Sequence, residues 1–351
     1  MKILQLIDTL HPGGAERMAV NYANALYDKG HDSHLICTRE EGSFKALLNP
    51  GVSYLLLNKK SVFDIQSLLK LRKYISLNNI EVVHAHGSSW FYAILCKIIR
   101  KDFKVIWHDH YGNSEYLEKR PTQYLKCFSQ FFDGIISVNK RLEKWAMDNL
   151  RCENITFINN FIYPNEREKN KIHIDNEAFN IVCLANLRIQ KDHLTLMKAC
   201  DIISKKHSIV LHIIGKDFRD EYSKMIKREF KKRSYLVYHG EVKDSFSFLE
   251  NMNLGVLSSR SEGLPLTLLE YGLAGLSVVC TDVGECRRIV GNNGILIPPG
   301  DVRAMREAIL KFIKDPSLYC IETKYLKEKI RNHYSYEAVL PIYERFCEKL
   351  C

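Results

Sequence analysis

Short apolar runs that alternate with helical segments are the feature of this sequence that most restricts its fold. The runs at 2–8, 81–87 and 104–110 are rich in branched residues and have the length of buried strands. Between such runs, residues 17–30 and 65–79 repeat apolar side chains at the spacing of an amphipathic helix. This β-α-β order predicts an α/β protein in which helices cover both faces of an open parallel sheet.

The alternation is interrupted once, near the middle of the chain. Residues 161–178 are charged and poor in apolar side chains, which is typical of a linker. The alternation then restarts with the strand-like run FNIVCLAN. We therefore predict two Rossmann-like domains, residues 1–165 and 166–334, each built on a doubly wound parallel sheet.

The composition favours a cytoplasmic protein. The chain has 351 residues, of which 46% are hydrophobic and 26% charged, enough for two cores. No apolar run reaches the roughly 18 residues of a transmembrane helix, and the first apolar stretch is shorter than the ~7–15 residues of a signal peptide. The eleven cysteines are scattered and contain no Cys-x-x-Cys pair, so we expect reduced thiols rather than disulfides or a zinc site.

The net charge of +10 has several readings. It indicates a solvated basic surface, a face that approaches an anionic membrane, an anionic substrate or nucleic acid. Basic residues gather at Lys97, Arg100, Lys101 and Lys104, beside Trp107 and an apolar segment. No RNP, KH or zinc-finger signature occurs, so we expect no nucleic-acid partner.

The segment HPGGAER follows the first expected strand, where ligands of such sheets bind. Gly13 and Gly14 let the backbone approach a ligand closely, and the next helix presents amides with a positive dipole end. This suits a phosphate or a sugar hydroxyl, whereas a simple tight turn is the alternative. The segment matches neither the dinucleotide fingerprint nor a P-loop.

Four histidines close two of the expected strands. His84 and His86 end one strand, and His108 and His110 end another, so each pair faces one side of the sheet. A metal site is possible, but no cysteine or acidic pair completes a recognisable ligand set. We favour one histidine that contacts substrate and neighbours that hydrogen bond to it. Asp109 is expected to point the opposite way.

Two cations follow the first strand of the second half. Arg188 and Lys191 lie three residues apart, just ahead of an expected helix. At a strand-to-helix turn they can neutralise a diphosphate, or they can be an ordinary solvated helix start.

The segment SEGLPLTLLEYGLAG places two carboxylates in an otherwise apolar stretch. Pro265 suits the first turn of a helix, with Glu262 before it and Glu270 inside it. The amides of Leu264 and Leu266 can hold a phosphate, and Glu270 can bind a vicinal diol such as ribose. A hydrolase with two catalytic carboxylates is the rival interpretation.

Together these motifs resemble those of the retaining, nucleotide-sugar-dependent glycosyltransferases of family 4, which have the GT-B fold. The most specific element is Glu-x7-Glu, here Glu262 and Glu270 within SRSEGLPLTLLEYGLAGLSVVCTDVG. GGAER, HAHG, WHDH, LRIQKDH, HIIG, YHGEVKD and GILIPPGD follow the order of the family. The resemblance implies two domains that face a cleft, with the last helix, residues 335–351, packing back on the first domain.

The resemblance also implies roles for the first-domain residues and for the lysine. Gly13 and Gly14 would border the donor phosphate and the acceptor. His110, with His108 as the alternate, would match the cleft histidine that contacts the transferred sugar. Lys191 would match the lysine that binds the diphosphate.

The same resemblance implies how the donor is held elsewhere. Glu262 would contact hydroxyls of the donor sugar, and Glu270 would contact the ribose. The backbone near His239, Gly240 and Val242 would hold the base.

One position departs from the family. Many members have an arginine five residues before the lysine, where this chain has Asn186. We expect Arg188 to supply that positive charge instead.

The expected reaction moves a hexose-type sugar from a UDP- or GDP-sugar to a lipid-linked or polysaccharide acceptor, as in lipopolysaccharide or capsule synthesis at the inner face of the membrane. Lys191, Arg188 and the helix dipole would stabilise the departing nucleoside diphosphate. No Asp-x-Asp motif stands at a suitable strand end, so we expect no metal and no other cofactor. The alternatives are an epimerase or hydrolase of similar fold and a non-catalytic nucleotide or nucleic-acid binding module.

Overall fold

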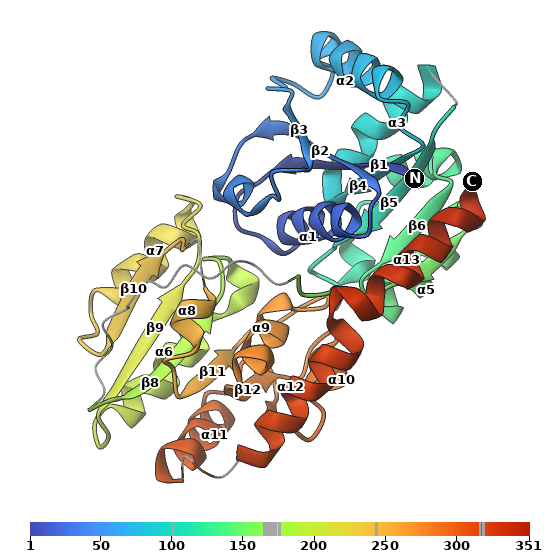
Figure 1. Cartoon of the computed structure of the whole chain (residues 1–351). Helices are drawn as coiled ribbons and strands as arrows, with labels where there is room; N and C mark the ends of the chain where they lie inside the picture. The colour runs from blue at the N-terminus through green and yellow to red at the C-terminus, as the bar shows by residue number, and fades with distance from the viewer. Residues whose placement is uncertain (100–101, 164–173, 175–176, 243–244, 316, 318–319) are drawn as a thin grey trace. The chain divides into compact units, whose positions relative to one another are not determined.

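The computed structural model divides the chain into two compact units (Figure 1). Unit 1 contains Met1–Tyr163 and Ser335–Cys351, and unit 2 contains Pro164–Tyr334. The structure describes residues 1–99, 102–163, 174, 177–242, 245–315, 317 and 320–351. The predicted linker at 161–178 lies mostly outside these described residues.

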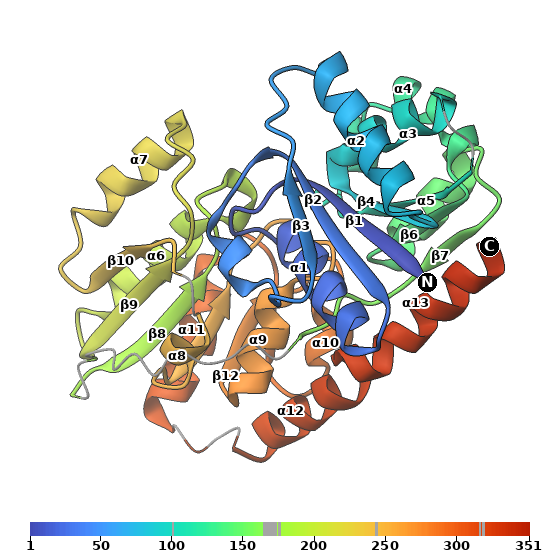
Figure 2. The same ribbon diagram turned by 45° about the horizontal axis from the view of Figure 1, so that its top comes forward.

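Unit 1 is built on a seven-stranded sheet in the order β3-β2-β1-β4-β5-β6-β7, and every pairing in it is parallel (Figure 2). The strands are β1 (Lys2–Thr9), β2 (Asp32–Glu40), β3 (Ser53–Leu56), β4 (Val82–His86), β5 (Lys104–Asp109), β6 (Gly134–Ser137) and β7 (Ile155–Phe157). The apolar runs at 2–8, 81–87 and 104–110 predicted β1, β4 and β5, and the sequence patterns are confirmed there. They missed β7, because three half-buried residues carry no readable alternation.

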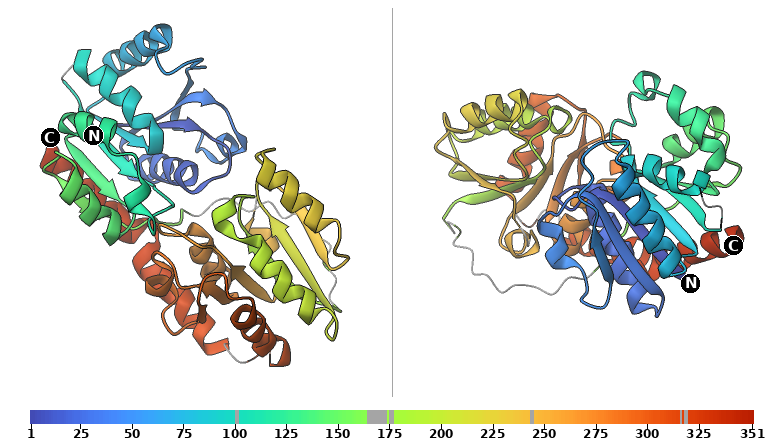
Figure 3. Two further views of the ribbon diagram at one scale, coloured as in Figure 1. Left: turned by 180° about the vertical axis from the view of Figure 1, so that it is seen from behind. Right: turned by 90° about the horizontal axis from the view of Figure 1, so that it is seen from above.

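Helices cover both faces of this sheet (Figure 3). They are α1 (Gly14–Asp28), α2 (Ile65–Leu77), α3 (Trp90–Ile99), α4 (Gln123–Phe128), α5 (Lys140–Asn149) and α13 (Tyr336–Leu350). Alternate residues of β2 enter different cores: Leu35 and Cys37 join the cluster under α1, while Ile36 joins the cluster under α2 and α3. This two-sided burial explains why the strands read as almost continuous apolar runs.

The last helix, α13, belongs to unit 1. Its Tyr343 packs against the rings of both Tyr22 on α1 and His84 on β4, at centroid distances of 4.7 and 5.0 Å. His31 Nε2 and Glu344 Oε1, 2.7 Å apart, add a polar contact at its edge. These contacts place an aromatic residue of the chain's end against the core histidines.

Unit 2 repeats the architecture with six strands in the order β10-β9-β8-β11-β12-β13, again all parallel. The strands are β8 (Phe179–Leu184), β9 (Ile209–Ile214), β10 (Leu236–Gly240), β11 (Leu254–Leu257), β12 (Ser277–Thr281) and β13 (Ile295–Ile297). The helices are α6 (His193–Ile203), α7 (Glu221–Phe230), α8 (Phe246–Leu249), α9 (Leu266–Ala274), α10 (Cys286–Val290), α11 (Val302–Lys314) and α12 (Cys320–Tyr334). Asp301 caps α11 by accepting a hydrogen bond from the amide of Ala304, at 2.9 Å.

Both sheets have a switch point at the strand that opens the unit. β1 lies between β2 and β4, and β8 lies between β9 and β11, so each chain segment first adds two strands on one side of its opening strand and then adds the remaining strands on the other side. Ligands of doubly wound sheets bind at the carboxyl edge near such a point. The predicted fold class, two doubly wound α/β domains, is confirmed.

Two further expectations concern the compartment. All ten cysteines for which side chains are described are free. Within the described part of the chain, no helix has both the length and the apolar character needed to cross a bilayer.

Candidate active site

The loops after β8 and β11 bring a lysine and a glutamate together. Lys191 Nζ donates to Glu262 Oε1 at 2.5 Å, and the same oxygen accepts from Ser259 Oγ at 2.6 Å. Glu262 is only 6% exposed. Because β8 and β11 are adjacent and parallel, residues 71 positions apart reach the same edge of the sheet. Two predicted site residues therefore contact each other directly.

The backbone around Lys191 is tied to the glutamate loop. Ser258 Oγ donates to the Lys191 carbonyl at 2.9 Å, and the Arg260 amide donates to the Gln190 carbonyl at 2.7 Å. Arg260 Nε also donates to Asp192 Oδ2 at 2.8 Å. Asp192 has a left-handed backbone, φ 45° and ψ 50°, and caps α6. These contacts fix the direction in which Lys191 leaves the loop.

A third loop, after β12, packs against the backbone of the loop that carries Glu262. Gly284 has φ +52°, and a Cβ there would lie 2.3 Å from the Glu262 carbonyl oxygen. The amide of Glu285 donates to the Gly263 carbonyl at 3.0 Å. Only glycine fits this close approach. The sequence analysis did not single out Gly284, although it ends the quoted motif TDVG.

The helix α9 begins between the two carboxylates, Glu262 and Glu270, as the sequence analysis predicted. Pro265 is its N-cap, one residue earlier than the predicted first turn, and no side chain caps the helix. Leu264 is buried just before it, Leu266 is its first residue, and Glu270 lies half-buried in its second turn. The helix thus directs its N-terminal end, with its positive dipole, to the carboxyl edge that carries Glu262.

Asn186 stands where many family members have an arginine, and Arg188 was expected to supply the missing charge. These two residues make separate contacts. Asn186 Oδ1 accepts from the Lys216 amide at 2.8 Å, so it braces the loop after β9. The exposed Arg188 lies with its guanidinium 4.4 Å from the ring centroid of Phe218.

The expected base-binding segment closes β10. Gly240 has φ +70°, and its carbonyl accepts from the Gly215 amide at 2.8 Å. Val242 follows and is half-buried. His239 Nε2 lies 2.9 Å from His212 Nδ1, which fixes the imidazole beside the glycine.

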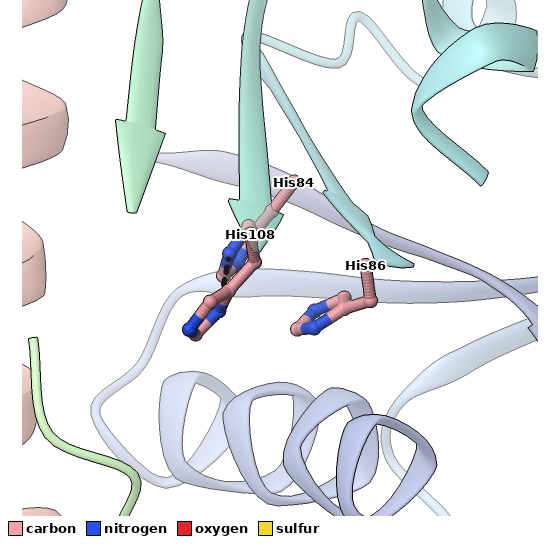
Figure 4. A group of neighbouring side chains, drawn as sticks. All are labelled: His84, His86 and His108. Atoms are coloured by element: carbon pink, nitrogen blue, oxygen red, sulfur yellow. Dashed lines mark hydrogen bonds between the residues drawn. The ribbon is translucent and has the colours of Figure 1, made fainter. Parts of the chain in front are cut away.

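The four histidines of unit 1 form a stack at the carboxyl edge of β4 and β5. Figure 4 shows three of them, His84, His86 and His108. His84 Nε2 lies 3.1 Å from His108 Nδ1, and His86 Nδ1 lies 3.0 Å from His110 Nε2. The side chains of His84, His86 and His108 are fully buried, whereas that of His110 is partly exposed. Burial lowers the pKa of all four imidazoles, that of His110 to about 3, so all are neutral near pH 7.

The same cluster has spacing that a metal ion can use. One ligand nitrogen from each of His84, His86 and His108 lies within 4.8 Å of the others. However, His86 Nε2 lies 2.8 Å from Gln5 Oε1, so both of its nitrogens already have protein partners. A metal ion would have to break one of these contacts.

Asp109 lies between His108 and His110 in the sequence, and its side chain points to the other face of the sheet. Its carboxylate accepts two hydrogen bonds from Arg120, at 2.6 and 2.9 Å. The guanidinium also lies 4.2 Å from the ring centroid of Trp145. Asp109 thus pairs with a cation, which the sequence analysis did not foresee because the partner lies eleven residues away in an irregular segment.

The glycines before α1 differ in their surroundings. Gly13 is the N-cap, and a Cβ on it would lie 2.2 Å from Glu16 Oε2. Gly14, the first helical residue, has open space where a Cβ would stand. A carboxylate therefore already lies at this helix start, and open space beside the backbone is found at Gly14.

A polar cluster at the end of β1 was not predicted. Asp8 accepts from Thr38 Oγ1 at 2.5 Å, from Ser88 Oγ at 2.6 Å and from Lys59 Nζ at 3.3 Å. Burial alone would raise the pKa of Asp8, but these contacts outweigh it and lower the pKa. The only sequence signal was one acidic residue at the end of an apolar run.

The two doubly wound parallel sheets, with polar groups at their carboxyl edges, have the architecture of the GT-B fold. Residues 12–166 match the family described as Glycosyltransferase Family 4, and residues 178–315 match Glycosyl transferases group 1. These two ranges cover most of the chain. The protein belongs to the family 4 glycosyltransferases and is an enzyme of the transferase class.

Known relatives span nearly the whole chain. The O-antigen biosynthesis glycosyltransferase WbnH of Escherichia coli is 29% identical over 294 residues, 81% of this chain and 82% of that protein. The E. coli UDP-Gal:alpha-D-GlcNAc-diphosphoundecaprenol alpha-1,3-galactosyltransferase is 23% identical over 354 residues, 92% and 90% of the two chains. Anabaena Alr3699/HepE, solved with UDP-glucose, shares the fold with a TM-score of 0.80 at 16% identity, over 100% and 99% of the chains.

Proposed function

We propose that this glycosyltransferase moves a hexose-type sugar, with retention of configuration, from a UDP- or GDP-sugar to a lipid-linked or polysaccharide acceptor of a cell-surface glycan. The acceptor class is supported by relatives whose names contain O-antigen biosynthesis and a diphosphoundecaprenol-linked substrate. A uridine donor is supported by the complex of HepE with UDP-glucose.

The contact between Lys191 and Glu262 is the observation that carries the proposal. The ammonium of Lys191 is held half-buried at the carboxyl edge of the sheet, near the start of α9. A diphosphate gives this ammonium a second anion, and its growing charge in the transition state strengthens the attraction. Glu262 then accepts hydrogen bonds from hydroxyls of the donor sugar.

The remaining roles are those that the sequence motifs predict for other residues of each unit. The amides of Leu264 and Leu266 at the start of α9 bind a phosphate oxygen. Glu270, one turn further along α9, accepts from the ribose diol. The backbone at Gly240 and Val242 holds the base, and Gly14 in unit 1 leaves room for a ligand beside the backbone.

We propose a metal-independent reaction. Lys191, Arg188 and the dipole of α9 supply the positive charge that a departing nucleoside diphosphate needs. His110 is neutral near pH 7, because burial lowers its pKa to about 3, and therefore contacts the transferred sugar by hydrogen bonding rather than by charge. The acceptor attacks on the face from which the diphosphate leaves.

A peripheral contact with an anionic membrane at its cytoplasmic face is part of the proposal. Of the predicted basic cluster, Lys97 and Lys104 share the carboxylate of Asp133, which offsets one of their two positive charges. Arg100 and Lys101 lie outside the described residues. The start of α2 is a better candidate. Phe63 and Ile65 there are 73% and 71% exposed, and the exposed side chains Lys70, Arg72 and Lys73 follow on the same helix.

The test of the catalytic proposal is a thermal-shift screen of UDP and GDP, followed by transfer assays with the matching nucleotide sugars. A bound nucleoside diphosphate should raise the melting temperature by mass action. Lys191→Ala should abolish that shift, whereas Lys198→Ala, an exposed lysine on α6, should not. Donor turnover that needs no acceptor would instead indicate a hydrolase or epimerase.

A further inference from the structure

Three side chains on neighbouring strands form a hydrogen-bonded chain in unit 1. Gln5 Oε1 on β1 lies 2.8 Å from His86 Nε2 on β4, and His86 Nδ1 lies 3.0 Å from His110 Nε2, directly after β5. β4 pairs with both β1 and β5, so this row of hydrogen-bonded side chains crosses the sheet from strand to strand. Gln5 and His86 are fully buried, and only His110 reaches the surface.

The order of donors and acceptors in this chain follows from the first contact. The structure places Gln5 Oε1 toward His86 and leaves Gln5 Nε2 buried without a hydrogen-bond partner. An amide oxygen only accepts, so with this orientation of the amide the proton of neutral His86 lies on Nε2 and its Nδ1 is an acceptor. His110 Nε2 must then donate to His86 Nδ1. Neutral His110 therefore carries its proton on Nε2 and has a lone pair on Nδ1.

We propose that Gln5 and His86 are positioning residues that hold His110 as its Nε2–H tautomer, so that Nδ1 accepts a hydrogen bond from a hydroxyl of the donor sugar. The second half of this statement rests on the proposed function. The first half concerns the tautomer alone and does not depend on any activity.

The other two histidines do not serve the same purpose. His84 and His108 pair with each other, and their outer nitrogens, His84 Nδ1 and His108 Nε2, are buried without a hydrogen-bond partner. Their rings pack against Tyr22 of α1, at centroid distances of 5.0 and 5.8 Å. This pair is enclosed, whereas the Gln5–His86–His110 chain leads from the core to the surface.

Unit 2 contains a second chain of the same kind. Asn180 Oδ1 lies 3.0 Å from His212 Nε2, and His212 Nδ1 lies 2.9 Å from His239 Nε2. The orientation of the Asn180 amide is set independently, because its Nδ2 donates to the Ala178 carbonyl at 3.0 Å. His239 is therefore the Nε2–H tautomer by the same reasoning, and it provides an internal reference.

Long-range ¹H–¹⁵N NMR of the histidine rings in the full-length protein tests the proposal, because it reports which nitrogen carries the proton. We expect His110 and His239 both to be Nε2–H at pH 7.5. In Gln5→Met the acceptor is lost while the shape is kept, so the Nδ1–H form of His110 should appear and His239 should stay unchanged. Gln5→Glu keeps an acceptor oxygen, and while His86 stays neutral, which the same spectra report, His110 should remain Nε2–H.

Several outcomes overturn the positioning role. They are a wild-type His110 that carries its proton on Nδ1, a Gln5→Met variant whose His110 remains entirely Nε2–H, or Zn²⁺ that binds stoichiometrically and shifts the His86 signals. If Gln5→Met does not fold, the wild-type spectrum and the Gln5→Glu spectrum still decide the tautomer.

Kinetics test the contact with the donor sugar. Loss of one neutral hydrogen bond should lower kcat/KM for the donor by roughly 2- to 10-fold in Gln5→Met, with UDP or GDP binding unchanged and activity restored in Gln5→Glu. A Gln5→Met enzyme with the altered tautomer and wild-type kcat/KM would overturn the sugar contact alone. Absence of all glycosyl transfer, with the expected spectra, would overturn the proposed function and leave the positioning role intact.

Discussion

Lys191 Nζ and Glu262 Oε1 lie 2.5 Å apart, although the residues come from loops after different strands. The contact is held by a third group, Ser259 Oγ, on the same carboxylate oxygen. An ammonium and a carboxylate that neutralise each other are stable without substrate. The incoming diphosphate and sugar hydroxyls can then share the pair, so binding does not have to create a buried isolated charge.

This pairing predicts a coupling between the two residues. Lys191→Ala should lower kcat by about 10²- to 10³-fold, the range for removal of one group that stabilises transition-state charge. Glu262→Gln keeps the shape and should also impair transfer. In a double-mutant cycle the loss of activation free energy in the double variant should be smaller than the sum of the losses in the two single variants, since each substitution breaks the same contact. Additive effects would contradict a shared role.

Glu270 and Glu262 should separate nucleotide binding from transfer. We expect Glu270→Ala to weaken the thermal shift produced by UDP or GDP, because the ribose diol loses its acceptor. Glu262→Ala should keep that shift and lose transfer. The measurement is a nucleotide titration of both variants beside a transfer assay. Wild-type transfer rates in both variants would show that this site assignment is wrong.

Gly284 should be intolerant of any side chain. Gly284→Ala combines a left-handed backbone with a Cβ placed 2.3 Å from the Glu262 carbonyl oxygen. Gly275→Ala is the matched control, because it has φ +78° and open space around the new Cβ. Denaturant unfolding should show that Gly284→Ala costs at least about 1 kcal/mol more than the control, and its transfer rate should fall as Glu262 moves. Equal losses in the free energy of unfolding of the two variants would mean that the loop accommodates the new side chain without strain.

The buried histidines predict that the protein is destabilised by mild acid. Their pKa values are lowered in the folded state, so the unfolded state binds more protons below its pKa of about 6.5. Stability is therefore complete above about pH 6.5 and falls as the pH drops toward the folded pKa values. Each of His84, His86 and His108 adds about 1.4 kcal/mol per pH unit to this slope once its unfolded form is fully protonated.

The check is chemical denaturation of the wild type and of His84→Phe between pH 7.5 and pH 5. The variant should show a slope smaller by about 1.4 kcal/mol per pH unit at the acid end. The absolute stability at pH 7.5 is a separate quantity, because the substitution also removes the contact to His108. Identical slopes in the two proteins would contradict the assignment of a neutral, buried His84.

Local sequence pattern was sufficient for most of the fold. The apolar runs are strands because both sheet faces are covered, and helix starts such as Asp301 supply their own cap. The three-residue strands β7 and β13 were not predicted from their pattern, because pairing with a neighbouring strand, not local periodicity, makes them strands.

The sequence by itself determined the alternation of elements, the kinds of residues that end each strand and the order of the family motifs, because these depend on neighbours along the chain. Only the tertiary structure decided which of those residues meet. Lys191 reaches Glu262, Asp109 pairs with Arg120, and Gln5 reaches His86 because adjacent parallel strands bring distant residues to one edge or one face of a sheet. Strand order is set by packing of the whole unit, which no local pattern records.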